Sequence, residues 1–247
     1  MMNYELAEAC GNTFVLFDCL KQNSVDESYL QQAQRRLVQE NRDDALILID
    51  GMIKEDSFFI KMLVLGLDGA LGEFCGNGSR AVAAYLFKNY PGFKGYFLNG
   101  CPLIEYGHQI YSIKLPSPRF ELNPKFVTSS ELFGLQYVEM IEPHLVYFGE
   151  LSDEALLELG SEINRRKDLF PLGMNVNASH VLSDGKLSVK TYERGVQRLT
   201  RSCGTGSISS AAARFDTGSI LVSTPGGDLE VNIEKDGVLL KGPAFVS

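Results

Sequence analysis

Apolar residues follow two different spacings along the chain, and each spacing predicts a different kind of element. Residues 13–17, Thr-Phe-Val-Leu-Phe, are β-branched or aromatic and favour a strand. Within 26–40 the apolar residues recur on one helical face after an acidic start, which predicts an amphipathic helix. Comparable short runs predict strands at 45–52, 57–65, 93–99, 103–106, 110–115, 136–141, 145–148, 175–182 and 186–193.

One ten-residue pattern occurs twice. Residues 75–84 read Cys-Gly-Asn-Gly-Ser-Arg-Ala-Val-Ala-Ala, and residues 203–212 read Cys-Gly-Thr-Gly-Ser-Ile-Ser-Ser-Ala-Ala. Each copy predicts an alanine-rich helix with a cysteine at its start, the first ending near residue 89 and the second near residue 216. A separate helix start at 152–154 follows the one at 26–28 by almost the same interval, about half the chain. The chain is therefore a duplicated unit.

The duplication predicts two domains, 1–117 and 118–247. Prolines between 116 and 124 bar both helix and central strand, so this stretch is the candidate linker. Each half reads as strands around one buried helix, an α+β fold whose two halves are pseudo-symmetric. Asn12 is expected in a turn between strands, and loops 66–73 and 194–202 are expected to deliver the cysteines. Pseudo-twofold packing would bring the two helix starts together at a cleft.

The composition is that of an ordinary globular protein with an acidic balance. Hydrophobic residues make up 45% and charged residues 22%, and the net charge of −8 argues against a nucleic-acid partner. The amino terminus is acidic where a secretory signal would be basic. The apolar run 62–65 is far shorter than a membrane span. We therefore expect a cytoplasmic protein that does not enter a membrane.

The five cysteines differ in their context. They lack any C-x-x-C pair, which argues against a zinc site, and a disulfide framework is not expected in a reducing compartment. Cys10, Cys19 and Cys101 are interpreted as small buried hydrophobic residues. The repeated glycine context sets Cys75 and Cys203 apart from them.

Two thiols suit the inversion of a carbon that bears an acidic proton. Removing a proton from one face and returning it to the other takes two acid/base groups, and a thiol with a pKa of about 8.5 can serve in either form. A helix N-terminus lowers a thiol's pKa and attracts anions. The backbone N–H groups of Gly76, Asn77, Gly204 and Thr205 would hold a substrate carboxylate and the developing negative charge. Such a reaction needs no metal and no organic cofactor.

Other readings of the glycine motif fit less well. Gly76-x-Gly78-x-x-Ala81 matches the dinucleotide fingerprint in form, but no apolar strand runs directly into it. A P-loop is excluded because the G-K-[ST] ending is absent. A Cys-His hydrolase would leave the second thiol without a role. A pyridoxal enzyme with a Schiff-base lysine, and a binding protein in which both motifs are packing corners, stay open as alternatives.

At these residues the chain resembles the diaminopimelate epimerase family, whose members are cofactor-independent two-cysteine isomerases. The resemblance covers nearly the whole chain. It rests on the two cysteine motifs together with these segments: Gly11-Asn12-Thr13-Phe14, Pro143-His144, Asn175-Val176-Asn177, Tyr192-Glu193-Arg194-Gly195, Pro225-Gly226-Gly227 and Gly242-Pro243-Ala244. It implies two similar α/β domains, each a curved, mainly antiparallel sheet around a central helix.

The resemblance also assigns roles to individual residues. It implies that Cys75 and Cys203 are the base and acid, which exchange roles with reaction direction. Arg194 suits a second substrate carboxylate and Glu193 suits an ammonium. A homodimer is a further family expectation. The substrate contacts it implies are Asn12, Gly76, Asn77, Asn175, Glu193, Arg194, Gly204 and Thr205.

Three departures from the family pattern bear on the substrate. Asp44 stands where the family usually has glutamine, and Gly66 and Glu142 stand where it usually has asparagine. In the family these positions help to read the far, non-reacting end of diaminopimelate. We therefore expect epimerisation of LL- and meso-diaminopimelate for lysine and peptidoglycan synthesis. The alternative is a broader racemase that accepts acidic amino acids such as glutamate or aspartate.

Overall fold

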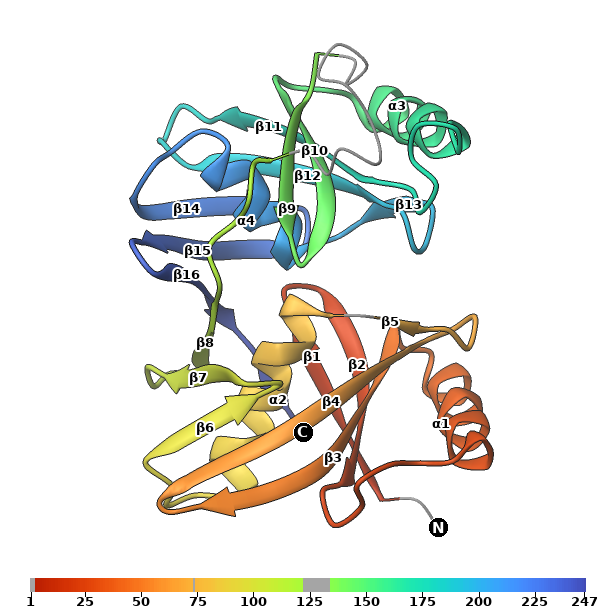
Figure 1. The fold of residues 1–247 in the computed structure, drawn as a ribbon, viewed down its shortest axis with the longest axis vertical. Helices are drawn as coiled ribbons and strands as arrows, with labels where there is room; N and C mark the ends of the chain where they lie inside the picture. Colours follow the sequence, from red (N-terminus) through yellow and green to blue (C-terminus); the bar gives the residue numbers. More distant parts are fainter. Residues whose placement is uncertain (1–2, 73, 122–133) are drawn as a thin grey trace. The chain divides into compact units, whose positions relative to one another are not determined.

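A computed structural model describes residues 3–72, 74–121 and 134–247 (Figure 1). The chain divides into two compact units, which we call the first unit (Met1–Leu115 with Lys241–Ser247) and the second unit (Pro116–Leu240). The final seven residues thus join the first unit, whereas the domain boundary predicted at 117/118 places them in the second half. As a division into functional domains, that boundary stays a prediction. Pro124 of the predicted linker lies outside the described residues.

The first unit combines strands with two helices. Its strand β17 comes from the carboxyl terminus and pairs with β1. The elements are β1 (Tyr4–Ala9), β2 (Asn12–Cys19), α1 (Glu27–Glu40), β3 (Asp44–Lys54), β4 (Ser57–Gly66), β5 (Leu71–Gly72), α2 (Gly76–Asn89), β6 (Gly95–Leu98), β7 (Cys101–Glu105), β8 (Ile110–Leu115) and β17 (Phe245–Val246).

The second unit repeats this order of elements. Its last strand, β16, runs on into residues that belong to the first unit. The elements are β9 (Gln136–Met140), β10 (Glu142–Phe148), α3 (Asp153–Arg165), β11 (Asn175–Val181), β12 (Leu187–Glu193), β13 (Arg198–Thr200), α4 (Gly204–Ala212), β14 (Gly218–Thr224), β15 (Gly227–Glu234) and β16 (Gly237–Pro243).

Strand pairing follows one scheme in both units. In the first unit β1–β2 and β3–β4 are antiparallel, and the crossovers through α1 and α2 make β2–β3 and β4–β6 parallel. In the second unit β9–β10 and β11–β12 are antiparallel, and the crossovers through α3 and α4 make β10–β11 and β12–β14 parallel. The expected α+β class with mainly antiparallel sheets is confirmed, and the duplication extends to topology.

Each unit buries one helix and leaves the other on its surface. α1 and α3 begin at Asp26 and Ser152, whose side chains accept N–H bonds from the first turn, and they bury only their inner faces. By contrast α2 is buried from Gly76 to Leu86 and α4 from Gly204 to Ala211. Strands β1, β2, β6, β7, β8 and β17 contact α2, and β9, β10, β11, β12, β14 and β15 contact α4 (Figure 1). Small side chains allow this close approach.

Three local predictions are wrong. Asn12 is the first residue of β2 rather than part of the turn, which consists of Cys10 and Gly11, both with positive φ. The two loops expected before the cysteines contain short strands, β5 and β13, because each pairs with the long strand that precedes it. α4 ends at Ala212 rather than near 216, since its carbonyls are satisfied by a tight final turn, in which Phe215 N–H donates to Ala211.

None of the helices in the described part of the chain is both long and apolar enough to cross a membrane.

Candidate active site

Cys75 caps the buried helix of the first unit, as the repeat predicts. Its backbone is extended, and its Sγ accepts the N–H of Gly78 at 3.2 Å. A Cβ at 78 would lie 2.9 Å from Leu46 Cδ2 and 3.2 Å from the Cys75 Sγ, so any other residue would require the end of the Leu46 side chain to move. Gly76 and Asn77 form the first helical turn, where backbone N–H groups lack intrahelical acceptors. The predicted anion cradle therefore has the backbone of a helix start, and its binding of an anion stays a prediction.

Cys203 caps α4 in the second unit with the same geometry. Its Sγ accepts the N–H of Gly206 at 3.3 Å and lies 3.4 Å from the hydroxyl oxygen of Thr205. A Cβ on Gly206 would lie 2.5 Å from Asn177 Oδ1 and 2.7 Å from Thr191 Oγ1, so only glycine fits. Gly204 and Thr205 begin the helix as Gly76 and Asn77 do. All five cysteines lie among the described residues, and none of them is in a disulfide.

A fully buried arginine lies beneath the start of α2. Arg80 is 0% exposed, and its guanidinium donates to Gly76 O at 3.2 Å and to Asn77 Oδ1 at 2.6 Å. Burial lowers the pKa of Arg80, whereas the neighbouring thiols of Cys10 and Cys75 act to raise it. The sequence motif contains Arg80, but sequence reasoning gives it no role. A charged residue inside an otherwise small and apolar helix is the signal that could have pointed to it.

The surroundings of Cys203 are anionic instead. Burial raises the pKa of Cys203 well above its ordinary value, and the charges of Glu193 and Glu142 raise it further, against weaker help from Thr205 and the Gly206 N–H. The helix start does act to lower this thiol's pKa through the Gly206 N–H, but desolvation and two carboxylates outweigh it, so the expected net lowering is wrong. Cys203 is accordingly a thiol at neutral pH.

Glu193 is itself a half-buried carboxyl at the end of β12. Burial raises its pKa, as does the charge of Glu142, while the hydroxyl of Thr200 donates to Oε1 at 2.6 Å and opposes the shift. A hydrogen bond with Cys203 also favours the charged form. The acid and the thiol thus share one environment in the second unit.

Asn175 connects the predicted substrate contacts of the second unit. Its Nδ2 donates to Glu142 Oε2 at 2.8 Å, and its Oδ1 accepts the backbone N–H of Arg194 at 3.0 Å. These residues lie at one end of three adjacent strands, since Glu142 starts β10, Asn175 starts β11 and Glu193 ends β12. The structure thus brings Glu142, Asn175, Glu193 and Arg194 together beside Cys203.

A second buried polar group lies under α4. His144 is 0% exposed; its Nδ1 is 3.1 Å from Asn177 Nδ2, and Asn177 Oδ1 accepts the hydroxyl of Thr191 at 2.8 Å. Burial lowers the pKa of His144 to about 3, and the nearby charge of Arg194 adds to this. His144 is therefore a neutral imidazole that accepts through Nδ1. Sequence reasoning treats this histidine only as a family landmark.

The first unit gathers its own predicted contacts in a comparable way. Asn12 starts β2, and Asp44 and Gly66 are register partners at the matching ends of β3 and β4. Asp44 also aligns with Phe14, two residues after Asn12. Two of the three departures from the family pattern thus lie opposite each other. Within residues 3–72, 74–121 and 134–247, no group of three or more His, Cys, Asp or Glu side chains is placed to hold a metal ion.

No family model matches the chain. Curated relatives do: a diaminopimelate epimerase from Methanothrix thermoacetophila is 31% identical, over 95% of this chain and 90% of the relative. One from Rhodococcus erythropolis is 30% identical, over 81% of this chain and 73% of the relative. The chain belongs to the diaminopimelate epimerase family. A third such epimerase, from Clostridium perfringens, is 28% identical over 98% of this chain and 96% of its own.

Solved structures share the fold of this epimerase at low sequence identity. A hydroxyproline epimerase from Agrobacterium vitis aligns with a TM-score of 0.69 at 15% identity, covering 100% of this chain and 89% of that one. A PhzF-family phenazine biosynthesis protein from Enterococcus faecalis aligns with a TM-score of 0.62 at 14% identity, covering 98% of this chain and 95% of that one. These likenesses show the fold alone. The curated relatives show that the chain is an isomerase that epimerises or racemises an amino acid.

Proposed function

We propose that this epimerase interconverts LL- and meso-2,6-diaminopimelate by two-base proton transfer at the α carbon, with Cys75 and Cys203 as the acid/base pair. The curated relatives named diaminopimelate epimerase support the substrate. The observation that carries the mechanism is the duplicated helix cap, in which each thiol stands at the start of a buried helix. The proposed product would serve lysine and peptidoglycan synthesis.

The proposed chemistry balances without a cofactor. A thiolate takes the α proton and becomes a thiol, while the thiol on the opposite face gives its proton to the carbon and becomes a thiolate. The negative charge that builds up on the substrate carboxylate is held by N–H groups of Gly76, Asn77, Gly204 and Thr205, which belong to the first helical turns. Asn12, Asn175, Glu193 and Arg194 are the proposed contacts for the rest of the substrate.

The assignment of acid and base follows from the two environments. Cys203 is held as a thiol by burial and by the charge of Glu193. In the resting protein Cys203 is therefore the proton donor, which leaves Cys75 as the base. After one turnover the roles are reversed, and solvent exchange restores the resting state.

One observation favours a second candidate function, a racemase of broader range. Glu142 accepts a hydrogen bond from the side-chain amide of Asn175 and adds a negative charge beside Glu193. Two carboxylates at this place attract a substrate whose far end carries an ammonium and repel one whose far end carries only a carboxylate. Among broader substrates, basic amino acids such as lysine are therefore favoured over the glutamate and aspartate that the sequence suggested.

The test is deuterium incorporation at the α carbon in D2O, followed by NMR, with LL-diaminopimelate, lysine and glutamate offered separately. Exchange with diaminopimelate supports the proposed function, and no exchange with any of the three contradicts it. Added exchange with lysine supports the broader racemase. In Glu142→Asn we expect the ratio of lysine to glutamate exchange to fall about tenfold. Glu158→Gln, an exposed change on α3, is the matched control.

Compartment and assembly are part of the same proposal. We place the epimerase in the cytoplasm, where two catalytic thiols stay reduced. We also propose a homodimer, which light scattering at several protein concentrations would test. A constant monomer mass would contradict the dimer and leave the proposed chemistry untouched.

A further inference from the structure

Arg80 is a fully buried cation of the first unit, and its charge needs to be balanced. A guanidinium stays protonated in proteins, and burying one without an anionic partner is costly. Its guanidinium donates to a backbone carbonyl at Gly76 and to an amide oxygen at Asn77, both neutral. Among the described residues, the charges that raise its pKa belong to two thiols and not to a carboxylate. The helix start therefore contains a buried cation whose oxygen acceptors are uncharged.

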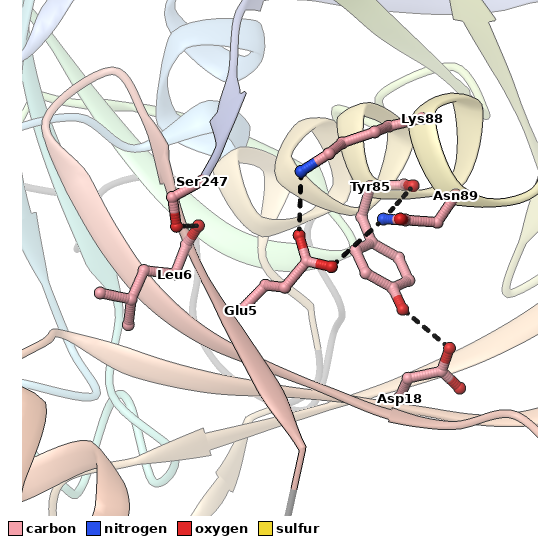
Figure 2. Close-up of polar contacts among 7 residues, drawn as sticks. All are labelled: Glu5, Leu6, Asp18, Tyr85, Lys88, Asn89 and Ser247. Atoms are coloured by element: carbon pink, nitrogen blue, oxygen red, sulfur yellow. Dashed lines mark hydrogen bonds and ion pairs between the residues drawn. The ribbon is translucent and has the colours of Figure 1, made fainter.

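The carboxylates on neighbouring strands are engaged elsewhere. Figure 2 shows Glu5 beside Lys88 and Asp18 beside Tyr85, both in the C-terminal half of α2. Asp18 also accepts the hydroxyl of Tyr90. On β7 and β8, Glu105 interacts with Tyr111, and Glu8 of β1 is exposed. None of these acids supplies the charge that acts on Arg80.

The charges of two thiols act on the guanidinium; that of Cys10 acts more strongly, and Cys10 also accepts a hydrogen bond from it. The two thiols are Cys10, in the turn between β1 and β2, and Cys75, at the cap of the same helix. Cys10 is 4% exposed, whereas Cys75 is partly exposed and accepts the N–H of Gly78 at 3.2 Å. The helix N-terminus adds a further favourable field at Cys75 but not at Cys10. Cys75 alone therefore combines the guanidinium with the field of a helix start and with access to solvent.

We propose that Arg80 is the counter-ion that holds Cys75 as a thiolate in the resting protein, making Arg80 a positioning residue for the reacting thiol. The hydrogen bonds to Gly76 and Asn77 fix the guanidinium under the first helical turn, so the charge is held in place before substrate arrives. This inference rests on the proposed function for the role of Cys75 as base. The ionisation itself is measured without any substrate.

The experiment measures thiolates in the full-length protein in two ways. Ultraviolet thiolate absorbance at neutral pH counts them, and iodoacetamide alkylation resolved by peptide mass spectrometry gives a pH profile for each cysteine. We expect one thiolate in the wild type, lost in Cys75→Ser and kept in Cys10→Ser. We also expect Cys75 to alkylate at lower pH than Cys203.

Substitutions of Arg80 then test the counter-ion. In Arg80→Met the alkylation profile of Cys75 should move to higher pH, so that its rate at neutral pH falls about tenfold or more while the high-pH plateau stays. Arg80→Lys should keep most of the wild-type profile. Lys88→Met removes an exposed cation from the same helix and should change nothing.

Three results would overturn the proposal. The first is a Cys75 profile in a folded Arg80→Met protein that matches the wild type. The second is a wild-type thiolate that disappears in Cys10→Ser rather than in Cys75→Ser. The third is a wild-type Cys75 that titrates at or above Cys203. The last two need no substitution of Arg80, so they decide the matter even where Arg80→Met does not fold. Epimerase activity enters none of them.

Discussion

Helices α2 and α4 begin with the same cysteine cap, but the charged side chains near the two caps differ. Each is capped by a cysteine whose Sγ accepts the N–H three residues on, and each has a glycine at that position. Under α2 lies Arg80, a buried cation. Near the start of α4 lie two carboxyls, Glu142 and Glu193, and a neutral imidazole. Identical caps therefore hold two thiols in opposite electrostatic surroundings.

This difference teaches that a repeated motif repeats geometry more faithfully than chemistry. The cysteine and the glycine three residues on fix the cap, since the thiol accepts that glycine's N–H and a Cβ on the glycine would crowd its neighbours. The positions that set charge, Arg80 against Ile208 in the motif, are free to diverge. In the proposed reaction the two thiols need one proton between them, and unequal surroundings decide which thiol holds it.

The largest expected effect is the loss of either thiol. Cys75→Ser or Cys203→Ser should lower turnover of diaminopimelate by a factor on the order of 10² to 10⁴, because one of two acid/base groups is lost. Initial rates in both reaction directions measure this. Cys101→Ser, a change at a cysteine on β7 outside the candidate site, is the matched control. Near-normal turnover in either catalytic variant would contradict the two-base mechanism.

The neutral imidazole of His144 makes the stability of the second unit sensitive to acid. His144 has a pKa of about 3 in the folded protein and an ordinary value of 6.5, so the unfolded chain binds the extra proton between these pH values. Stability is therefore present above pH 6.5 and is lost as the pH falls toward 3. The loss is on the order of 5 kcal/mol.

Urea unfolding at a series of pH values checks the sign and the size. His144→Gln should flatten the dependence on pH in this window relative to the wild type, whereas His180→Gln, near the end of β11, should leave it unchanged. Equal slopes in wild type and His144→Gln would show that the imidazole does not carry this acid sensitivity.

The parts of the fold that sequence predicts are those set by local rules. The helix starting after Asp26 and the two cysteine caps are predictable because capping and periodicity act within a few residues. β13 is missed because its three residues gain strand character only by pairing with β12. The end of α4 is missed because Ala213, at the C-cap, favours a helix, whereas a tight final turn closes the helix there.

The candidate site divides in the same way. The residue types in the two motifs are enough to identify Cys75 and Cys203 as the candidate acid/base pair. The contact of Asn175 with Glu142 depends on the register of β10 against β11, and the proximity of Cys10 to Arg80 depends on how a turn packs on a helix. Neither follows from spacing along the chain. The electrostatic difference between the two thiols is therefore not predictable from a repeat that looks symmetric.

The glycines of the two caps should differ in their tolerance of a methyl group. Gly206→Ala places a Cβ against Asn177 Oδ1 and Thr191 Oγ1, which are hydrogen-bonded to each other in a buried network, and should cost about 2 to 3 kcal/mol of unfolding free energy. Gly78→Ala meets the movable end of Leu46 and should cost about 1 kcal/mol less. Chemical denaturation measures the unfolding free energy of both variants. Gly195→Ala is the control, because a Cβ at that position meets no atom within 4 Å. An equal loss at both caps would contradict the difference in packing.

The smallest effect isolates the negative charge beside Cys203. Because the charge of Glu193 raises the pKa of this thiol, Glu193→Gln should move its alkylation profile to lower pH by about one unit, a tenfold faster rate at fixed pH. Glu142→Gln should act in the same direction and more weakly, since its charge contributes less. Alkylation is the readout because Glu193 is also a proposed substrate contact, so activity would mix two effects. A profile that stays in place in Glu193→Gln would assign the raised pKa to burial alone, and the contrast between the two helix starts would then rest on Arg80.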